Sequence, residues 1–232
     1  MNNNMNNNMN NNMNISAYDV YDAYAKNDFA RVKLLISQGV NVNEKIFFGE
    51  TLLFKSCSWC DYKMVVMLIT YGANIHEKDA IGWTPLHRAC AYNFYKAVEL
   101  LIAHGVNIHE KDAYGNTSLH IACFQNHYET SELLLLNGSR VNEKDNDKET
   151  PLHMLCYNYD INTEKLIGLL ISYGANINEK SNIGETQMMV AKKHKQEKTF
   201  MFLKKEMSKR IYILSLIVNN DVLKHYIIKK ID

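Results

Sequence analysis

Short apolar runs alternate with longer polar stretches along this chain, and each run ends shortly before a glycine. The runs occupy residues 34–36, 68–69, 100–102, 133–135 and 169–171. The glycines that follow are Gly39, Gly72, Gly105, Gly138 and Gly174. A glycine just beyond a helical apolar stripe can take the left-handed conformation that closes a helix. The pattern therefore predicts a series of helices that end at equivalent places.

A second signal lies upstream of these glycines. Asn27, Asn93 and Asn126 stand at equivalent distances before Gly39, Gly105 and Gly138. After glycine, asparagine is the residue best suited to a left-handed turn. We therefore expect each unit to contain a helix, a tight turn, a second helix and then an extended polar stretch such as residues 74–82.

A repeat sets the spacing of these units. Thr51, Thr84, Thr117 and Thr150 are 33 residues apart, and Thr186 follows after 36. Units are thus expected to start near residues 18, 51, 84, 117, 150 and 186. One helix pair cannot cover its own apolar stripe, so several units must stack to make a continuous core. The extra residues of the fifth unit fall at 158–163, where they are expected to lengthen a surface turn between two helices.

The segment Thr84-Pro85-Leu86-His87-Arg88-Ala89 resembles the phrase of the ankyrin repeat family. The resemblance covers about residues 18–205, with six units of which the first and last are degenerate. It implies an all-α solenoid of stacked helix-turn-helix units joined by short hairpin-like loops. It also implies that Thr84 and His87 tie the turn to its neighbour, and that Pro85 starts the first helix. The second unit has Phe54 in place of the histidine, so its turn is expected to be less well tied.

Three regions follow from this organisation. Residues 1–14 repeat Met-Asn-Asn-Asn and are expected to form a disordered Asn/Met-rich tail, with prion-like self-association as the alternative. Residues 15–205 are expected to form the repeat array. Residues 206–232 are expected to form a basic helical C-terminal extension that caps it.

Composition narrows the functional classes. The chain has 232 residues, of which 47% are hydrophobic, so it can bury a core and is not wholly disordered. Its net charge of +1 is not the excess of positive charge that would indicate a nucleic-acid partner. The charge is uneven, because residues 186–232 hold 11 Lys and Arg against 4 Asp and Glu. The alternative function is therefore an adaptor whose basic C-terminal helices bind an acidic partner, nucleic acid or an anionic membrane surface.

The residues that could carry chemistry recur at repeat positions and do not form a separate, unrepeated site. Cys57, Cys90, Cys123 and Cys156 share one repeat position and are expected to pack as small hydrophobes. Cys60 falls at the turn position and is expected to be an exposed thiol. No unrepeated nucleophile, base or phosphate loop is found, so we expect no enzyme activity, cofactor, metal or small-molecule substrate. Unpaired cysteines suit a reducing compartment, the cytoplasm first and the nucleus as the alternative.

The informative residues are those that vary at otherwise regular positions. The resemblance implies that partners bind the concave side, made of the loop tips and the outward side of the first helices. The tip residues are Phe48, Glu50, Ala80, Ile81, Trp83, Ala113, Tyr114, Asn116, Asp147, Glu149, Ile183 and Glu185. The helix residues are Lys55, Trp59, Arg88, Tyr92, Ile121, Gln125, Met154 and Asn158.

A protein partner is expected on this surface, with the chain itself a monomer. Trp, Tyr and Arg dominate binding energy at interfaces, so we expect a central patch of Trp59, Trp83, Tyr92 and Tyr114 with Arg88. The alternative interpretation is that Trp59 and Tyr92 pack on neighbouring repeats.

Overall fold

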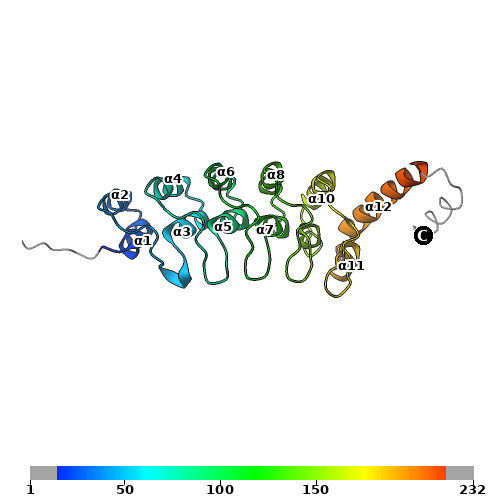
Figure 1. Ribbon diagram of the computed structural model, residues 1–232, viewed down its shortest axis with the longest axis horizontal. Helices are drawn as coiled ribbons and strands as arrows, with labels where there is room; N and C mark the ends of the chain where they lie inside the picture. The colour runs from blue at the N-terminus through cyan, green and yellow to red at the C-terminus, as the bar shows by residue number, and fades with distance from the viewer. Residues whose placement is uncertain (1–14, 218–232) are drawn as a thin grey trace, which may run out of the picture.

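The computed structural model describes residues 15–217, and all regular elements in this range are helical. Six helix pairs follow one another along the chain (Figure 1). They are α1 (Ala17–Ala25) with α2 (Phe29–Ser37), α3 (Leu52–Ser58) with α4 (Tyr62–Thr70), α5 (Pro85–Ala91) with α6 (Tyr95–Ala103), α7 (Ser118–Phe124) with α8 (Tyr128–Leu136), α9 (Pro151–Met154) with α10 (Thr163–Ser172), and α11 (Gln187–Lys193) with α12 (Glu197–Ile217). A 3₁₀ turn, η1 (Phe47–Gly49), precedes α3. The predicted all-helical solenoid is confirmed.

The pairs stand side by side in a row, as Figure 1 shows. The second helices α2, α4, α6, α8 and α10 lie along one edge, and the hairpin-like loops lie along the opposite edge. The first helices run between these edges. Each unit therefore presents its loop tip and the adjoining side of its first helix to the same side of the molecule.

Left-handed residues make the turns inside the units. The turn residue has a positive φ in five units: Asn27 (57°), Cys60 (55°), Asn93 (53°), Asn126 (58°) and Lys195 (58°). Among residues other than glycine, asparagine tolerates this conformation best, which explains why it recurs at this position. The glycines predicted to end the second helices also have positive φ, for example Gly105 at 80°.

The repeated histidines join neighbouring units. The backbone N–H of Thr117 donates to Nδ1 of His120 at 3.1 Å, so this nitrogen carries no proton. Nε2 of His120 then donates to the carbonyl oxygen of Glu149 in the next unit, at 3.2 Å. His87 makes the same contacts with Thr84 and with the carbonyl of Asn116. The tie between turns that the family resemblance implied is thus present.

Register-locked apolar positions form the core. The leucine two residues after each threonine is fully buried, as is the cysteine four residues further on. These residues are Leu53, Leu86, Leu119 and Leu152, with Cys57, Cys90, Cys123 and Cys156. Burial raises the pKa of the Cys57 thiol to about 12, so it stays protonated at neutral pH. The cysteines at this position pack as small hydrophobes, as predicted.

The fifth unit accommodates its insertion by shortening a helix. Helix α9 ends at Met154, and residues 155–162 lead to α10 through turns. Cys156 keeps its buried place, and its thiol donates to the carbonyl of Leu152 at 3.3 Å. Thr163 reaches back to the preceding unit, where its hydroxyl donates to Asn126 at 2.8 Å. The insertion therefore changes the turn while the contact between units is kept.

Helix α12 closes the row at its C-terminal end. Met207 stands at the place in the last unit where Gly72 stands in the second, 21 residues after the threonine. Without a glycine there, α12 continues without a break across the expected boundary at residues 205 and 206. Leu203 is fully buried against the array, and Arg210 donates to the carbonyl of Ala175 at 3.3 Å. The predicted tail at residues 1–14 and residues 218–232 of the predicted extension lie outside the described residues. Among the described helices, none is long and apolar enough to cross a membrane.

Candidate functional site

Backbone hydrogen bonds link the loop tips into a continuous edge. The N–H of Ala113 donates to the carbonyl oxygen of Ile81 at 3.0 Å, and the N–H of Asn146 donates to the carbonyl oxygen of Tyr114 at 3.0 Å. Further along, the N–H of Asn182 donates to the carbonyl oxygen of Asp147 at 2.7 Å. Because the backbone fixes the tips, their side chains are held at defined positions. Tyr114 is 62% exposed there.

Beside this edge, the third to fifth units enclose a groove of about 530 Å³. Its lining residues come from loop tips and first helices: Trp83, Tyr114, Asn116, His120, Ile121, Phe124, Gln125, Asp145, Asn146, Asp147, Glu149, Met154 and Tyr157. Eight residues of the predicted binding set therefore lie in one groove: Trp83, Tyr114, Asn116, Ile121, Gln125, Asp147, Glu149 and Met154. Its walls combine aromatic rings with carboxylates.

Two aromatic residues of the groove, Phe124 and Tyr157, were not predicted. Both come seven residues after the threonine of their unit, and three residues after the predicted Ile121 and Met154 respectively. Residues three or four apart share one face of a helix, so Phe124 and Tyr157 belong to the same face as the predicted helix residues. The signal was available in the sequence, because the corresponding residues of the second and third units are Ser58 and Ala91.

The acidic end of the groove is organised around Asp145. Its Oδ1 accepts hydrogen bonds from the N–H groups of Asp147 at 2.9 Å and Glu149 at 2.8 Å. The hydroxyl of Tyr157 donates to Oε1 of Glu149 at 2.6 Å. Burial raises the pKa of Glu149, and the charges of Asp145, Asp147 and Glu185 raise it further. The hydrogen bond from Tyr157 acts in the opposite direction and lowers this pKa. Burial also raises the pKa of Asp145.

Arg88 is engaged inside the molecule. Its guanidinium donates to Oε1 of Glu50 at 2.9 Å, and Glu50 also forms an ion pair with Lys55. The same guanidinium lies 4.5 Å from the centre of the Phe54 ring and 4.9 Å from that of Trp83. Where the second unit lacks the histidine tie, Phe54 thus packs beneath Arg88 of the next unit. Arg88 joins two units at this place.

The other predicted residues lie outside the groove. Trp59 stacks on Tyr24 of the first unit, with ring centres 4.4 Å apart, as in the alternative interpretation of packing on a neighbouring repeat. Tyr92 is half exposed, and its carbonyl accepts a weak hydrogen bond from the exposed thiol of Cys60. Phe48 is 85% exposed on η1, and Ile81 is exposed on its loop tip. The structure therefore brings Trp83 and Tyr114 together in the groove and places Trp59 in a separate aromatic cluster.

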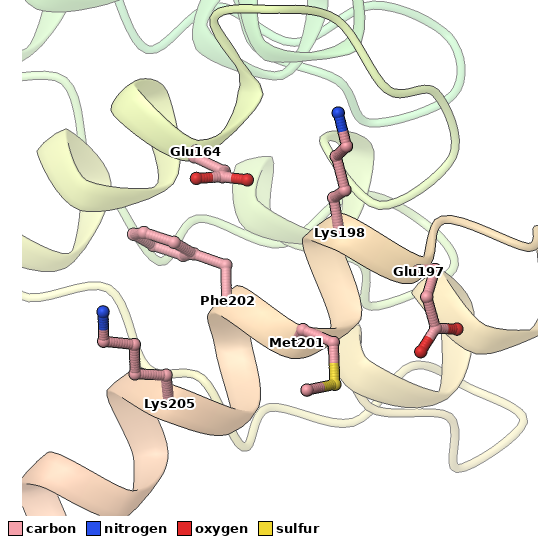
Figure 2. A pocket seen from close by; sticks show the side chains of 6 residues that line it. All are labelled: Glu164, Glu197, Lys198, Met201, Phe202 and Lys205. Atoms are coloured by element: carbon pink, nitrogen blue, oxygen red, sulfur yellow. The ribbon is translucent and has the colours of Figure 1, made fainter.

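The basic C-terminal part forms a different surface. Figure 2 shows Lys205 and Phe202 pointing from α12 toward the helix that carries Glu164. A depression of about 410 Å³ lies here, between α10 and α12. Nζ of Lys198 lies 5.1 Å from the centre of the Tyr159 ring. This depression has one aromatic residue in its lining, against four in the groove.

Comparison with known proteins identifies the repeats. A family model described as ankyrin repeats in three copies matches residues 20–112, 60–145 and 119–212. The comparison with curated proteins gives no match. The matched segments together cover most of the described residues, including every unit that contributes to the groove.

Proposed function

Because the chain belongs to the ankyrin-repeat family, we propose that it is a non-catalytic scaffold that binds a partner protein through its loop tips and first helices. Ankyrin repeats are generally protein–protein interaction modules. The repeated residues have structural roles, since the threonines and histidines tie units together and the cysteines fill the core. Recognition is left to the residues that differ from unit to unit.

The observation that carries this proposal is the groove across the third to fifth units. It is lined by four aromatic side chains together with carboxylates, and aromatic residues are enriched at binding hot spots. Tyr114 and Phe124 are 62% and 41% exposed, so their rings are available to a partner. The tips are fixed by backbone hydrogen bonds, and a preorganised surface loses little conformational freedom on binding.

The proposal is tested by affinity capture with mass spectrometry. The full chain is immobilised and exposed to an extract of the cells that naturally express it, and a Tyr114→Ala/Phe124→Ala variant is compared with the unchanged chain. We expect the variant to lose the specifically captured protein by at least tenfold, since a buried hot-spot side chain contributes about 2 kcal/mol. Within the described part of the chain, neither the Tyr114 nor the Phe124 side chain forms a hydrogen bond, so both changes leave the internal hydrogen bonds in place.

A matched control variant is Tyr62→Ala/Tyr95→Ala. These tyrosines are 40% and 41% exposed at the starts of α4 and α6, on the opposite edge of the row (Figure 1). The control variant is expected to capture the partner as the unchanged chain does. Equal capture by the groove variant, with unchanged folding, would contradict the proposed binding face.

The alternative function uses the basic C-terminal helices. It is favoured by the exposed lysines Lys192, Lys195, Lys204 and Lys205 on and between α11 and α12. Binding through them would weaken steeply as salt rises from about 50 to 200 mM, because phosphate contacts release counterions. We rank this second, because α12 also has a capping role through Leu203 and Arg210.

We infer that this binding takes place in a reducing compartment, the cytoplasm first and the nucleus as the alternative. The support is that all five cysteines are free thiols and four of them are buried. A monomer is expected, with a mass of 26.8 kDa in sedimentation.

A further inference from the structure

The repeat allows one unit to be compared with another at the residue that precedes each threonine. In the second unit this residue is Glu50, and in the fifth it is Glu149. Glu50 is held by two cations, Lys55 from α3 of its own unit and Arg88 from α5 of the next unit. Its charge is thus neutralised inside the molecule.

The fifth unit keeps the acid and replaces both cations. The position of Lys55 is taken by Met154, and the position of Arg88 is taken by Val190. Both side chains are buried. Among the residues that the structure describes, no Lys, Arg or His forms an ion pair with Glu149 or its neighbours Asp145 and Asp147.

The aromatic part of the arrangement is retained. At Glu50, the bound guanidinium of Arg88 lies against the rings of Phe54 and Trp83. At Glu149, the groove offers Tyr157, which is bonded to the carboxylate, together with Tyr114 and Phe124. A guanidinium is planar, stacks on aromatic faces and pairs with carboxylates through two parallel hydrogen bonds.

We propose that the groove receives an arginine side chain of the partner protein, whose guanidinium pairs with Glu149 as Arg88 pairs with Glu50. The proposal rests on the proposed function and specifies the chemistry of its partner, a segment with an exposed arginine. Oε1 of Glu149 is bonded to Tyr157, and no described residue donates to Oε2. That oxygen and the carboxylate of the exposed Asp147 are the acceptors offered to the incoming side chain.

Charge and burial in the groove support this assignment. The half-buried Glu149 lies near Asp145 and Asp147, and these like charges are brought together without an internal cation. A cation from outside would offset their repulsion and the cost of burial at once. It would also give the partner a fixed register on the row of repeats.

The test uses a random library of twelve-residue peptides displayed on phage and selected on the full chain. A selected peptide is synthesised with arginine and with the neutral isostere citrulline, and both are titrated against the unchanged chain and Glu149→Gln. We expect selected peptides to contain arginine, and either single change to weaken binding about tenfold. Making both changes together should add less than about twofold, because they remove the same pair.

Two further variants sharpen the result. Met154→Lys restores in the fifth unit the cation that Lys55 provides in the second. It should therefore weaken the binding of arginine peptides to a similar extent, while the midpoint of thermal unfolding stays that of the unchanged chain. Glu99→Gln on α6 removes one exposed acid away from the groove and should leave binding unchanged.

The outcomes separate this inference from the proposed function. One outcome is that selected peptides lack basic residues and bind Glu149→Gln as tightly as the unchanged chain, yet bind Tyr114→Ala/Phe124→Ala less tightly. In that case the proposal of an arginine is overturned, and the proposal of protein binding at the groove stands. If neither peptides nor a captured partner depend on the groove residues, both proposals are overturned.

Discussion

At the scale of single residues, Gly115 lies at a close approach between neighbouring loop tips. It has a φ of +83°, and a Cβ built on it would lie 2.6 Å from the backbone nitrogen of Asn146. Gly105 has nearly the same φ, +80°, and a Cβ there would meet nothing within 4 Å. The pair therefore separates the cost of an unfavourable φ from the cost of a steric clash.

We predict that Gly105→Ala lowers the free energy of unfolding by about 1 kcal/mol, the usual cost of an L-residue in this conformation. Gly115→Ala should cost at least about 2 kcal/mol more, because the backbone of the neighbouring tip must move. Urea denaturation followed by circular dichroism measures both values. Equal losses would show that the tips do not approach each other as described.

The buried histidines make stability depend on pH. Burial lowers the pKa of His120 to about 4, and it also lowers the pKa values of His87 and His153. In an unfolded chain a histidine has a pKa of about 6.5. The unfolded state therefore binds protons more readily, so this stability is fully present above about pH 6.5 and is lost as the pH falls toward 4.

We predict a fall in the free energy of unfolding between pH 7 and pH 5, of the order of 1 kcal/mol or more from His120, with contributions of the same sign from His87 and His153. Carboxylates with lowered pKa values, such as Glu110 and Glu143, lose their contribution only below about pH 4.5, outside this window. Urea titrations at pH 7, 6 and 5 measure the slope. His120→Gln cannot titrate and should flatten it, and an unchanged slope would contradict the account.

At the scale of elements, α12 acts as the cap of the last unit. Leu203 is fully buried, and Met201 on the same helix is 55% exposed. We predict that Leu203→Ala lowers the free energy of unfolding by about 2–4 kcal/mol, because it leaves a cavity under the cap. Met201→Ala, the matched control, should change it by less than about 1 kcal/mol.

Hydrogen exchange shows which part of the molecule opens first. In Leu203→Ala, amides of α11 and α10 should exchange faster, since a solenoid frays from a weakened end. Uniform acceleration through all units would indicate that α12 supports the whole array instead of capping one end.

Most elements could be predicted from the sequence because each depends on a local rule that recurs. A threonine begins a first helix, a left-handed residue turns the chain and a glycine ends the second helix. The exceptions depend on one substitution and one insertion. Met207 in place of glycine lets α12 continue, and the insertion after Met154 leaves α9 with 4 residues where α7 has 7.

The candidate site was predicted less completely, because exposure depends on partners in other units. Trp59 is packed on Tyr24, which stands in the degenerate first unit where the second to fifth units have cysteine, and no local pattern predicts that contact. Arg88 is of a residue type that is enriched at binding hot spots, but its guanidinium pairs with Glu50 inside the molecule. Tyr114 and Glu149 were found because they vary at loop tips that the backbone fixes in place.

At the scale of the whole molecule, a ladder of ion pairs runs across the units. Lys45, Lys78, Lys111 and Lys144 each pair with the glutamate of the following unit, at distances of 2.9, 2.5, 2.7 and 2.7 Å. Such partly exposed pairs contribute little energy singly. Together they repeat one contact along the row, in step with the regular spacing of the units and of their loop tips.

The proposed function requires the partner to bind the loop-tip side of this row. Hydrogen–deuterium exchange of the chain, free and saturated with its captured partner, maps the bound side. We predict slower exchange in the loop tips and first helices of the groove, residues 113–124 and 145–157, with little change in residues 95–103 and 128–136 of α6 and α8. Protection confined to α6 and α8, with the groove segments unchanged, would contradict it.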